Sequence, residues 1–222
     1  METPLNLRPI LSFLEDLSTH NNKVWFDENR PAYETARDTF EQFVDVLIDH
    51  LRASDQLQGV SAKDCVARIN RDIRFSKDKS PYKTNFGATI APGGRKATRL
   101  GYHISLAPQA QSLVAGGLYM PTPEQLACFR EAIDKQAEVF KKLTRAKAFV
   151  EAFGAIEGER LKTAPQGYDR AHPEIELLQL KQVVVVHHFS DTEVLAHDFP
   201  GQVVAVCRAM KPFLDYLNGI LA

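Results

Sequence analysis

The residues best suited to chemistry lie in one stretch, residues 68–85, which reads RINRDIRFSKDKSPYKTN. This stretch holds six of the 27 basic and two of the 28 acidic residues, a local net charge of +4, and the rest of the chain carries −5. Positive charge concentrated in an acidic background is typical of a site that attracts anions. The charged residues of the stretch are Arg68, Arg71, Asp72, Arg74, Lys77, Asp78, Lys79 and Lys83.

Arginine suits such a site because its planar guanidinium binds phosphate or carboxylate through two hydrogen bonds and keeps its charge at any working pH. We expect the anion-binding set to be Arg68, Arg71, Arg74 and Lys79. Asp72 could orient an arginine, bind a metal or act as a base, and Tyr82 could supply a hydroxyl donor or an aromatic platform. These two are the candidate catalytic residues. The expected supporting residues are Asp78, Lys83, Trp25 and Tyr168.

Alternation along the stretch adds a geometric prediction. If residues 65–75 form one extended strand, Arg68, Asn70, Asp72 and Arg74 share one face. The other face then carries Ile69, Ile73 and Phe75 as core residues, with Arg71 among them. A buried arginine needs a partner, because an unpaired buried charge is very costly. An acid elsewhere on the chain, a ligand, or a bulge near this arginine would each resolve the conflict.

The elements that must position this stretch follow from hydrophobic spacing. Apolar residues recur at helical spacing over residues 7–17 and 33–51. Short runs rich in β-formers then follow at residues 65–75, 86–91, 99–107, 113–119 and 182–188, with turn signals between the first four. Short connections between consecutive strands favour antiparallel pairing.

Helices return after these strands. Thr122-Pro123-Glu124-Gln125 predicts a helix start with a capping box, and residues 145–153 predict a shorter helix. Ser190 and Glu193 form a second capping box, and a helix from Pro200 onward should be kinked or split at Pro212. The sequence thus predicts an α+β fold with an antiparallel or mixed sheet of about five to six strands. N-terminal, central and C-terminal helices should pack against it, in a single domain spanning residues 1–222.

Other patterns limit the chemistry. The three cysteines form no C-x-x-C pair, which disfavours a disulfide framework or a zinc knuckle, and no histidine belongs to an H-E-x-x-H metal motif. His103 and His172 are weaker acid–base candidates, and Gly116-Gly117 indicates a bulge or a close backbone approach. We see no secretory signal and no apolar run of membrane-spanning length, so we expect a cytoplasmic protein without a membrane partner.

Four motifs resemble the uncharacterised, mostly bacterial family known as domain of unknown function 2461. They are R-x-x-R-D-x-R-F-x-x-D-K-x-x-Y (residues 68–82), N-N-K-V-W-F-x-x-N-R-x-x-Y (21–33), A-G-G-L-Y-M-P (115–121) and L-K-x-A-P-x-G-Y-D-x-x-H-P (161–173). The resemblance covers nearly the whole chain and brings no activity with it. It implies that the signature positions are Arg68, Arg71, Asp72, Arg74, Phe75, Asp78, Lys79 and Tyr82.

Three functions remain open at this point. The first is an anion-binding protein whose ligand is a phosphate-bearing metabolite or nucleotide, with phosphoester processing as its natural extension. The second is a nucleic-acid-binding module, in which Tyr82 or Trp25 would stack on bases, although the near-neutral total charge counts against it. The third is a structural or protein-interaction role, in which the arginines form internal salt bridges. No cofactor is implied. Arginines that converge on an open concave surface would favour a ligand, and arginines paired with internal carboxylates would favour the structural role.

Overall fold

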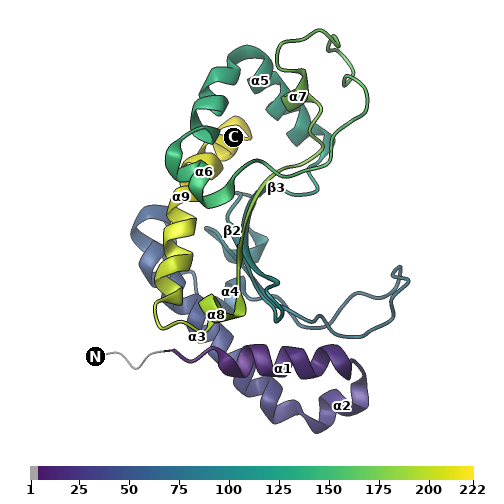
Figure 1. The fold of residues 1–222 in the computed structure, drawn as a ribbon, viewed down its shortest axis with the longest axis vertical. Coiled ribbons are helices and arrows are strands. Elements are labelled where there is room, and N and C mark those ends of the chain that lie inside the picture. The colour runs from purple at the N-terminus through teal and green to yellow at the C-terminus, as the bar shows by residue number, and fades with distance from the viewer. Residues whose placement is uncertain (1–4) are drawn as a thin grey trace. The chain divides into compact units, whose positions relative to one another are not determined.

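The computed structural model describes residues 5–222, and the chain divides into two compact units. Unit 1 contains the described residues up to Thr98, together with Tyr102–Val114 and His188–Val204. Unit 2 contains Arg99–Gly101, Ala115–His187 and Ala205–Ala222. One antiparallel sheet has the strand order β1-β2-β3-β4, and helices surround it, which confirms the predicted α+β class (Figure 1).

The sheet and the last helix link the two units along the chain. Strands β1 (Phe86–Ile90) and β2 (Tyr102–Leu106) belong to unit 1. Strands β3 (Ser112–Leu118) and β4 (Val183–Phe189) and helix α9 (Phe199–Ile220) each have residues in both units. In the part of the chain that the structure describes, no helix is both long enough and apolar enough to cross a membrane.

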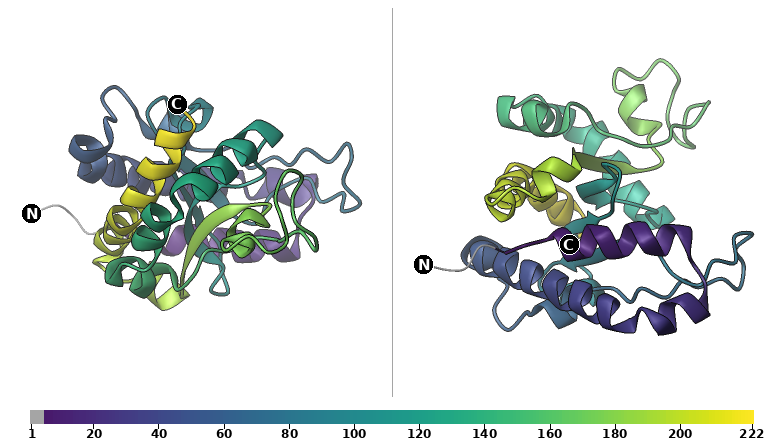
Figure 2. Two further views of the ribbon diagram at one scale, coloured as in Figure 1. Left: turned by 90° about the horizontal axis from the view of Figure 1, so that it is seen from above. Right: turned by 60° about the horizontal axis from the view of Figure 1, so that its bottom comes forward.

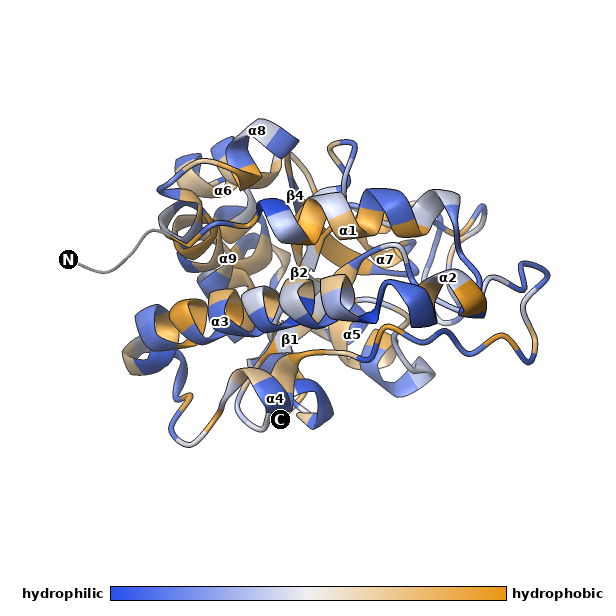
Figure 3. Cartoon of the chain, turned by 90° about the horizontal axis from the view of Figure 1, so that it is seen from below, coloured by the Kyte–Doolittle hydropathy of each residue, from blue (hydrophilic) through white to orange (hydrophobic). Residues whose placement is uncertain are grey.

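Helices pack against one side of the core of unit 1. They are α1 (Arg8–Thr19), α2 (Lys23–Glu28), α3 (Arg30–Asp55) and the short α4 (Ala62–Cys65). Each of α1 and α3 has a proline in its first turn, where the missing N–H costs nothing, and apolar residues spaced three or four apart. Helices α1 and α3 lie side by side (Figure 3), and the rings of Phe40 and Phe86 stack at 5.5 Å. The core therefore lies between these helices and one face of β1 and β2.

The opposite face of β1 and β2 is polar. In the register of the pair, Gly87 lies opposite Ser105 and Thr89 lies opposite His103. Phe86, which alternates with these residues, belongs to the buried face. Because side chains alternate along a strand, the same two strands contribute apolar residues to the core and polar residues to the opposite face. The row of polar residues continues into the segment before β1.

Unit 2 has its own aromatic core. Its helices are α5 (Pro123–Thr144), α6 (Lys147–Phe153) and α7 (Ile175–Leu178). The predicted capping box is present, with the Gln125 N–H donating to Thr122 Oγ1 at 3.3 Å and the Thr122 N–H donating to Gln125 Oε1 at 3.0 Å. The ring of Phe140 lies 5.3 Å from that of Phe129 and 6.1 Å from that of Phe213. These aromatic contacts tie α5 to the C-terminal part of α9.

The two glycines of β3 allow close packing, as the sequence predicts. Gly117 has φ +124°, and a Cβ there would lie 2.1 Å from the Val183 carbonyl oxygen. A Cβ on Gly116 would lie 2.4 Å from Met210 Sδ. A side chain at Gly117 would therefore collide with the backbone of β4, whereas one at Gly116 would press on a flexible side chain of α9.

Three local predictions differ from the structure. Residues 65–75 do not form a strand, so the sheet has four strands among the described residues rather than five or six. The helix α4 occupies the start of that stretch, with Ser61 and Asp64 forming a capping box. Helix α9 continues through Pro212, so the helix is not split there. The Ser190 capping box is confirmed, and helix α8 (Asp191–Val194) begins at it.

Candidate functional site

The signature stretch forms a long irregular hairpin, residues 66–88, which we call the basic hairpin. Two isolated antiparallel bridges hold it, one between Val66 and Ala88 and one between Asn70 and Tyr82. Four residue steps separate the bridges on the first arm and six on the second, so the pairing cannot continue as a regular ladder. The tip of the hairpin projects away from the rest of the ribbon in Figure 1 and in both views of Figure 2. The unequal numbers of residues between the two bridges are the physical reason why residues 65–75 do not form the predicted strand.

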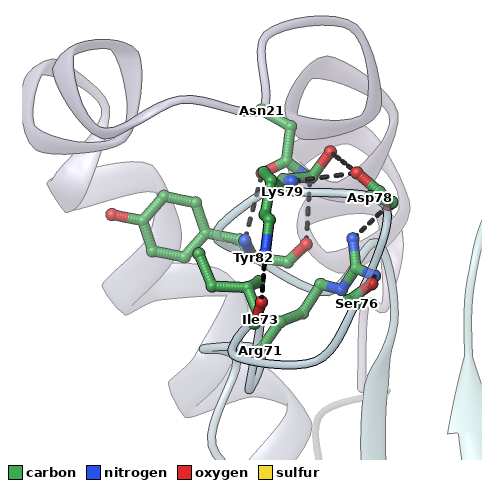
Figure 4. Close-up of polar contacts among 8 residues, drawn as sticks. Asn21, Arg71, Ile73, Ser76, Asp78, Lys79 and Tyr82 are labelled. Atoms are coloured by element: carbon green, nitrogen blue, oxygen red, sulfur yellow. Dashed lines mark hydrogen bonds and ion pairs between the residues drawn. The ribbon is translucent and has the colours of Figure 1, made fainter.

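Asp78 holds the tip of the basic hairpin together. Its carboxylate forms an ion pair with Arg71, which also donates to Ser76 Oγ at 3.4 Å (Figure 4). The other carboxylate oxygen accepts from the Ser80 N–H at 2.9 Å and from Ser80 Oγ at 2.7 Å. The hydrogen bonds from Ser80 first, and the Arg71 guanidinium second, hold the pKa of Asp78 well below its usual range. The predicted partner of the half-buried Arg71 is therefore an acid seven residues further along the same hairpin.

A second ion pair lies nearer the end of the tip. Arg74 binds Asp72 through two parallel hydrogen bonds, Nε to Oδ1 at 2.9 Å and Nη2 to Oδ2 at 2.6 Å. Both side chains are exposed, and the hydrogen bonds from Arg74 lower the pKa of Asp72. Asp72 therefore orients an arginine, as the sequence suggested, and both of its oxygens are already engaged by that arginine.

The predicted faces hold over part of the stretch only. Arg68, Asn70, Asp72 and Arg74 are all exposed, and Ile69 is buried, as alternation predicts. Phe75 was expected on the core face, and this expectation was wrong, because its side chain is 95% exposed. The tip extends past the core, so alternation there no longer distinguishes inside from outside.

The lysines of the hairpin bond only to backbone oxygens. Lys79 Nζ donates to the Ile73 carbonyl at 2.9 Å, and Lys83 Nζ donates to the Arg68 carbonyl at 3.1 Å. Within the described chain, Arg68, Lys77, Lys79 and Lys83 form no ion pair with a carboxylate within 4.0 Å. These four cations account for the net charge of +4 in the stretch, since the two acids neutralise Arg71 and Arg74.

Asn21 and Phe26 fasten the hairpin to the helices. The side-chain amide of Asn21, just before α2, donates to the Tyr82 carbonyl at 2.9 Å and accepts from the Tyr82 N–H at 3.1 Å. The rings of Tyr82 and Phe26 stack at 4.0 Å, and both residues are buried. The Tyr82 ring points away from Arg71 and Asp78 (Figure 4), and burial raises its pKa. Tyr82 thus anchors the hairpin, and its hydroxyl does not join the arginines.

A polar cavity of about 350 Å³ lies where the hairpin meets α1 and the start of α2. A second cavity of about 310 Å³ adjoins it, because both are lined by Ser18, Thr84 and Asn85. Asn85 Nδ2 donates to Ser105 Oγ at 2.8 Å and so links the cavity to the polar face of the sheet. The first cavity is lined by Ser18, Asn21, Arg71, Asp78, Ser80, Tyr82, Lys83, Thr84 and Asn85. Its lining is rich in hydroxyl, amide and cationic groups.

Positive charge accumulates beside this cavity. Burial first, and the charge of Arg68 second, lower the pKa of Lys83. Desolvation first, and the charge of Lys83 second, lower the pKa of His103, whose Nδ1 lies 3.5 Å from Thr89 Oγ1. Lys83 therefore lies near enough to Arg68 and to His103 for positive charge to disfavour the protonated forms of Lys83 and His103. A bound anion would oppose that effect.

The structure groups the predicted residues unevenly. Of those predicted, Arg71, Asp78, Tyr82 and Lys83 line the first cavity, whereas Arg68, Asp72, Arg74 and Lys79 do not. Trp25 stacks on His20 at 5.5 Å and is also outside the lining. Tyr168 belongs to unit 2, where its ring lies 6.1 Å from that of His172.

His172 has no free ring nitrogen for catalysis. Its Nδ1 accepts from the Glu174 N–H at 3.0 Å, so the proton must reside on Nε2, which lies 3.0 Å from Asp134 Oδ1. Among the described residues, no group of three or more His, Cys, Asp or Glu side chains could hold a metal ion. Cys65 and Cys207 are buried, and Cys128 is half-buried.

Sequence reasoning missed the neutral half of the cavity. Asn21, Thr84 and Ser105 were not predicted, although Asn85, Gly87 and Thr89 alternate with the buried Phe86, Ala88 and Ile90 into and along β1. That period-two pattern was the available signal. Asn21 carried no such signal, because its role depends on the packing of a segment 61 residues away.

Comparison with protein families gives one match. The family model described as a conserved hypothetical protein, DUF2461, matches residues 9–216. Comparisons with curated proteins and with solved structures give no match. The match covers nearly the whole chain and includes the basic hairpin. The chain therefore belongs to the DUF2461 family, as its motifs predicted.

Proposed function

We propose that the chain binds a phosphate-bearing small molecule, a metabolite or a nucleotide, in the cavity at the base of the basic hairpin. The observation that carries the proposal is that no carboxylate neutralises Lys83, which lines the cavity, or Arg68, whose charge lies near enough to lower the pKa of Lys83. Asp78, the carboxylate in the cavity lining, is engaged by Arg71 and Ser80. Lys83 and Arg68 therefore retain charge for a ligand.

The donors around the cavity suit a phosphate group. Lys83 supplies a point charge, and Arg71 has guanidinium N–H groups beyond those that bind Asp78 and Ser76. Ser80, Thr84 and Asn85 supply neutral donors. The volume of about 350 Å³ lies at the lower end of the range for ligand pockets, roughly 300–1,000 Å³. This size suits a phosphate with a small organic group.

The geometry favours binding over catalysis. Asp72 is held by Arg74 and does not line the cavity. Tyr82 lines the cavity, but its ring points away from Arg71 and Asp78 (Figure 4), so its hydroxyl is not placed beside them. The ion pairs of Arg71 and Arg74 favour a structural role for these two residues, in agreement with the alternative of an internal salt-bridge network. In this proposal, Arg71 shapes the cavity, and Arg68 and Lys83 supply the attraction.

Calorimetric titration with inorganic phosphate, pyrophosphate, ribose 5-phosphate and AMP tests the proposal. Hydrogen bonds to charged groups contribute roughly 1.5–3 kcal/mol, so Lys83→Gln should weaken binding by about 10- to 150-fold. Lys96→Gln, which removes an exposed lysine outside the cavity, should leave the affinity unchanged. A bound anion should also raise the pKa of His103, which NMR can follow.

Two results would refute the proposal. One is the absence of binding by any of the four ligands at millimolar concentration. The other is a Lys83→Gln protein that binds as tightly as the wild type. If Lys83→Gln instead unfolds, the conservative Lys83→Arg variant, which keeps the charge, should restore both folding and binding.

A further inference from the structure

The side chain of Phe75, at the tip of the basic hairpin, is 95% exposed. The other large hydrophobic side chains described as exposed reach at most 75%, at Met120. Exposing a whole aromatic ring to water forgoes the stabilisation that its burial would contribute. The hairpin is mostly hydrophilic, with short hydrophobic stretches toward its tip (Figure 3). An aromatic ring in this position is available to a partner.

The ring is arranged as a platform. The guanidinium carbon of Arg74 lies 5.9 Å from the centre of the Phe75 ring. Asp72 fixes that guanidinium through two parallel hydrogen bonds, so the cation is held before any partner arrives. A planar cation beside an aromatic face extends the surface on which a flat molecule can stack.

The charge around this platform is positive. Lys77 and Lys79 lie on the same tip, and Arg68 lies on the first arm of the hairpin. Asp72 and Asp78 are each committed to an arginine of the hairpin, which leaves these three cations without a carboxylate. A partner that complements the tip must therefore carry several negative charges and also contain flat rings that can stack on the platform.

We propose that the tip of the basic hairpin docks single-stranded nucleic acid, with a base stacked on Phe75 and phosphates held by Lys77 and Lys79. Single strands fit because their bases are free to stack, and every base offers a π-face. An acidic peptide would match the charge but not the platform. The inference goes beyond the proposed function, because the tip residues that stack and bind phosphate do not line the cavity.

Fluorescence anisotropy with a labelled 15-residue oligothymidylate and the full chain tests the inference. Stacking is worth roughly 1–3 kcal/mol per base, so Phe75→Ala should weaken binding about 5- to 150-fold, and Phe75→Trp should restore it. Tyr119→Ala, which removes another exposed aromatic at 72% exposure, should have no effect. Lys77→Gln should lower the slope of log affinity against log salt by about 0.7.

An abasic oligonucleotide separates stacking from charge. Phe75→Ala and the wild type should bind it equally, because it offers phosphates without bases. The inference is overturned if the wild type does not bind oligothymidylate at about 100 μM and 50 mM salt, the weak end of non-specific binding. It is also overturned if Phe75→Ala binds like the wild type, or if the variant loses as much affinity for the abasic strand. Because Phe75 packs against no core residue, a folding defect should not obscure these outcomes.

Discussion

Removing the Asn21 side-chain amide should loosen the basic hairpin while the rest of unit 1 stays folded. This amide makes two hydrogen bonds to the backbone of Tyr82, at 2.9 and 3.1 Å. It therefore satisfies the backbone N–H and carbonyl that a neighbouring strand would otherwise satisfy. Asn21→Ala deletes both bonds and leaves the Tyr82 N–H and carbonyl to water. The hairpin would then depend on its two bridges and on the stacking of Tyr82 against Phe26.

The expected loss follows from the number and setting of these bonds. A typical hydrogen bond contributes roughly 0.5–1.5 kcal/mol net, so two bonds correspond to about 1–3 kcal/mol. For a protein of this size, each kcal/mol lowers Tm by roughly 2–4 °C, which predicts a decrease of about 2–12 °C. Asn21 is half-buried, so neither the low nor the high end of this range is favoured in advance.

Hydrogen exchange locates the effect. The amides of Arg71, Tyr82 and Lys83 should exchange faster in Asn21→Ala, because they donate to Pro81, Asn21 and Ile69 within the loosened arm. The chain supplies a matched control in Asn218, whose half-buried amide bonds the backbone of Leu100 at 2.8 and 3.1 Å. Asn218→Ala removes the same two bonds and should leave exchange in the hairpin unchanged.

Two results would show that this reasoning is wrong. The first is unchanged exchange at Arg71 and Lys83 in Asn21→Ala, which would mean that the hairpin keeps its shape without the amide. The second is equal loss of hairpin protection in both variants, which would mean that the effect is global. Asn21→Asp, which keeps the acceptor and removes the donor, should fall between Ala and the wild type.

Three further predictions follow from other parts of the chain. The pKa of His103 is lower in the folded state than in the unfolded state, so the unfolded state takes up a proton at higher pH than the folded state does. The free energy of unfolding should therefore fall as pH drops below about 6.5. His103→Gln should flatten the plot of Tm against pH. In denaturant titrations Gly117→Ala should destabilise the protein by about 2 kcal/mol or more, because this residue has a positive φ and a Cβ there would meet the Val183 carbonyl. Gly219→Ala, whose Cβ would meet no atom on α9, should stabilise the protein by up to about 1 kcal/mol. Because β3, β4 and α9 have residues in both units, heat should unfold the chain in one calorimetric transition with equal calorimetric and van't Hoff enthalpies, and two resolved transitions would contradict this.

The fold could be predicted where local signals agree with one another. The capping boxes at Thr122 and Ser190 lie at real helix starts, since the geometry of a cap depends only on four consecutive residues. The glycines of β3 were recognised as a close approach because few other functions require two adjacent glycines in a strand. The strand predicted at 65–75 failed for the opposite reason. Its composition suits a strand, but pairing depends on register with a distant segment.

The candidate site shows the same division between local and distant information. Charge identified the basic hairpin, because a sum over neighbouring residues needs no fold. Charge alone could not tell which cations are free, since that depends on which carboxylate reaches which arginine. Asp78 meets Arg71 only because the hairpin turns back between them, and so the residues first chosen for anion binding include two that are already neutralised. The free charge lies at Arg68 and Lys83 at the base and at Lys77 and Lys79 at the tip. A phosphate ligand in the cavity should therefore be sensitive to changes in Arg68 and Lys83, and nucleic acid at the tip to changes in Lys77 and Lys79. Changes in Arg71 and Arg74 should act mainly through the shape of the hairpin.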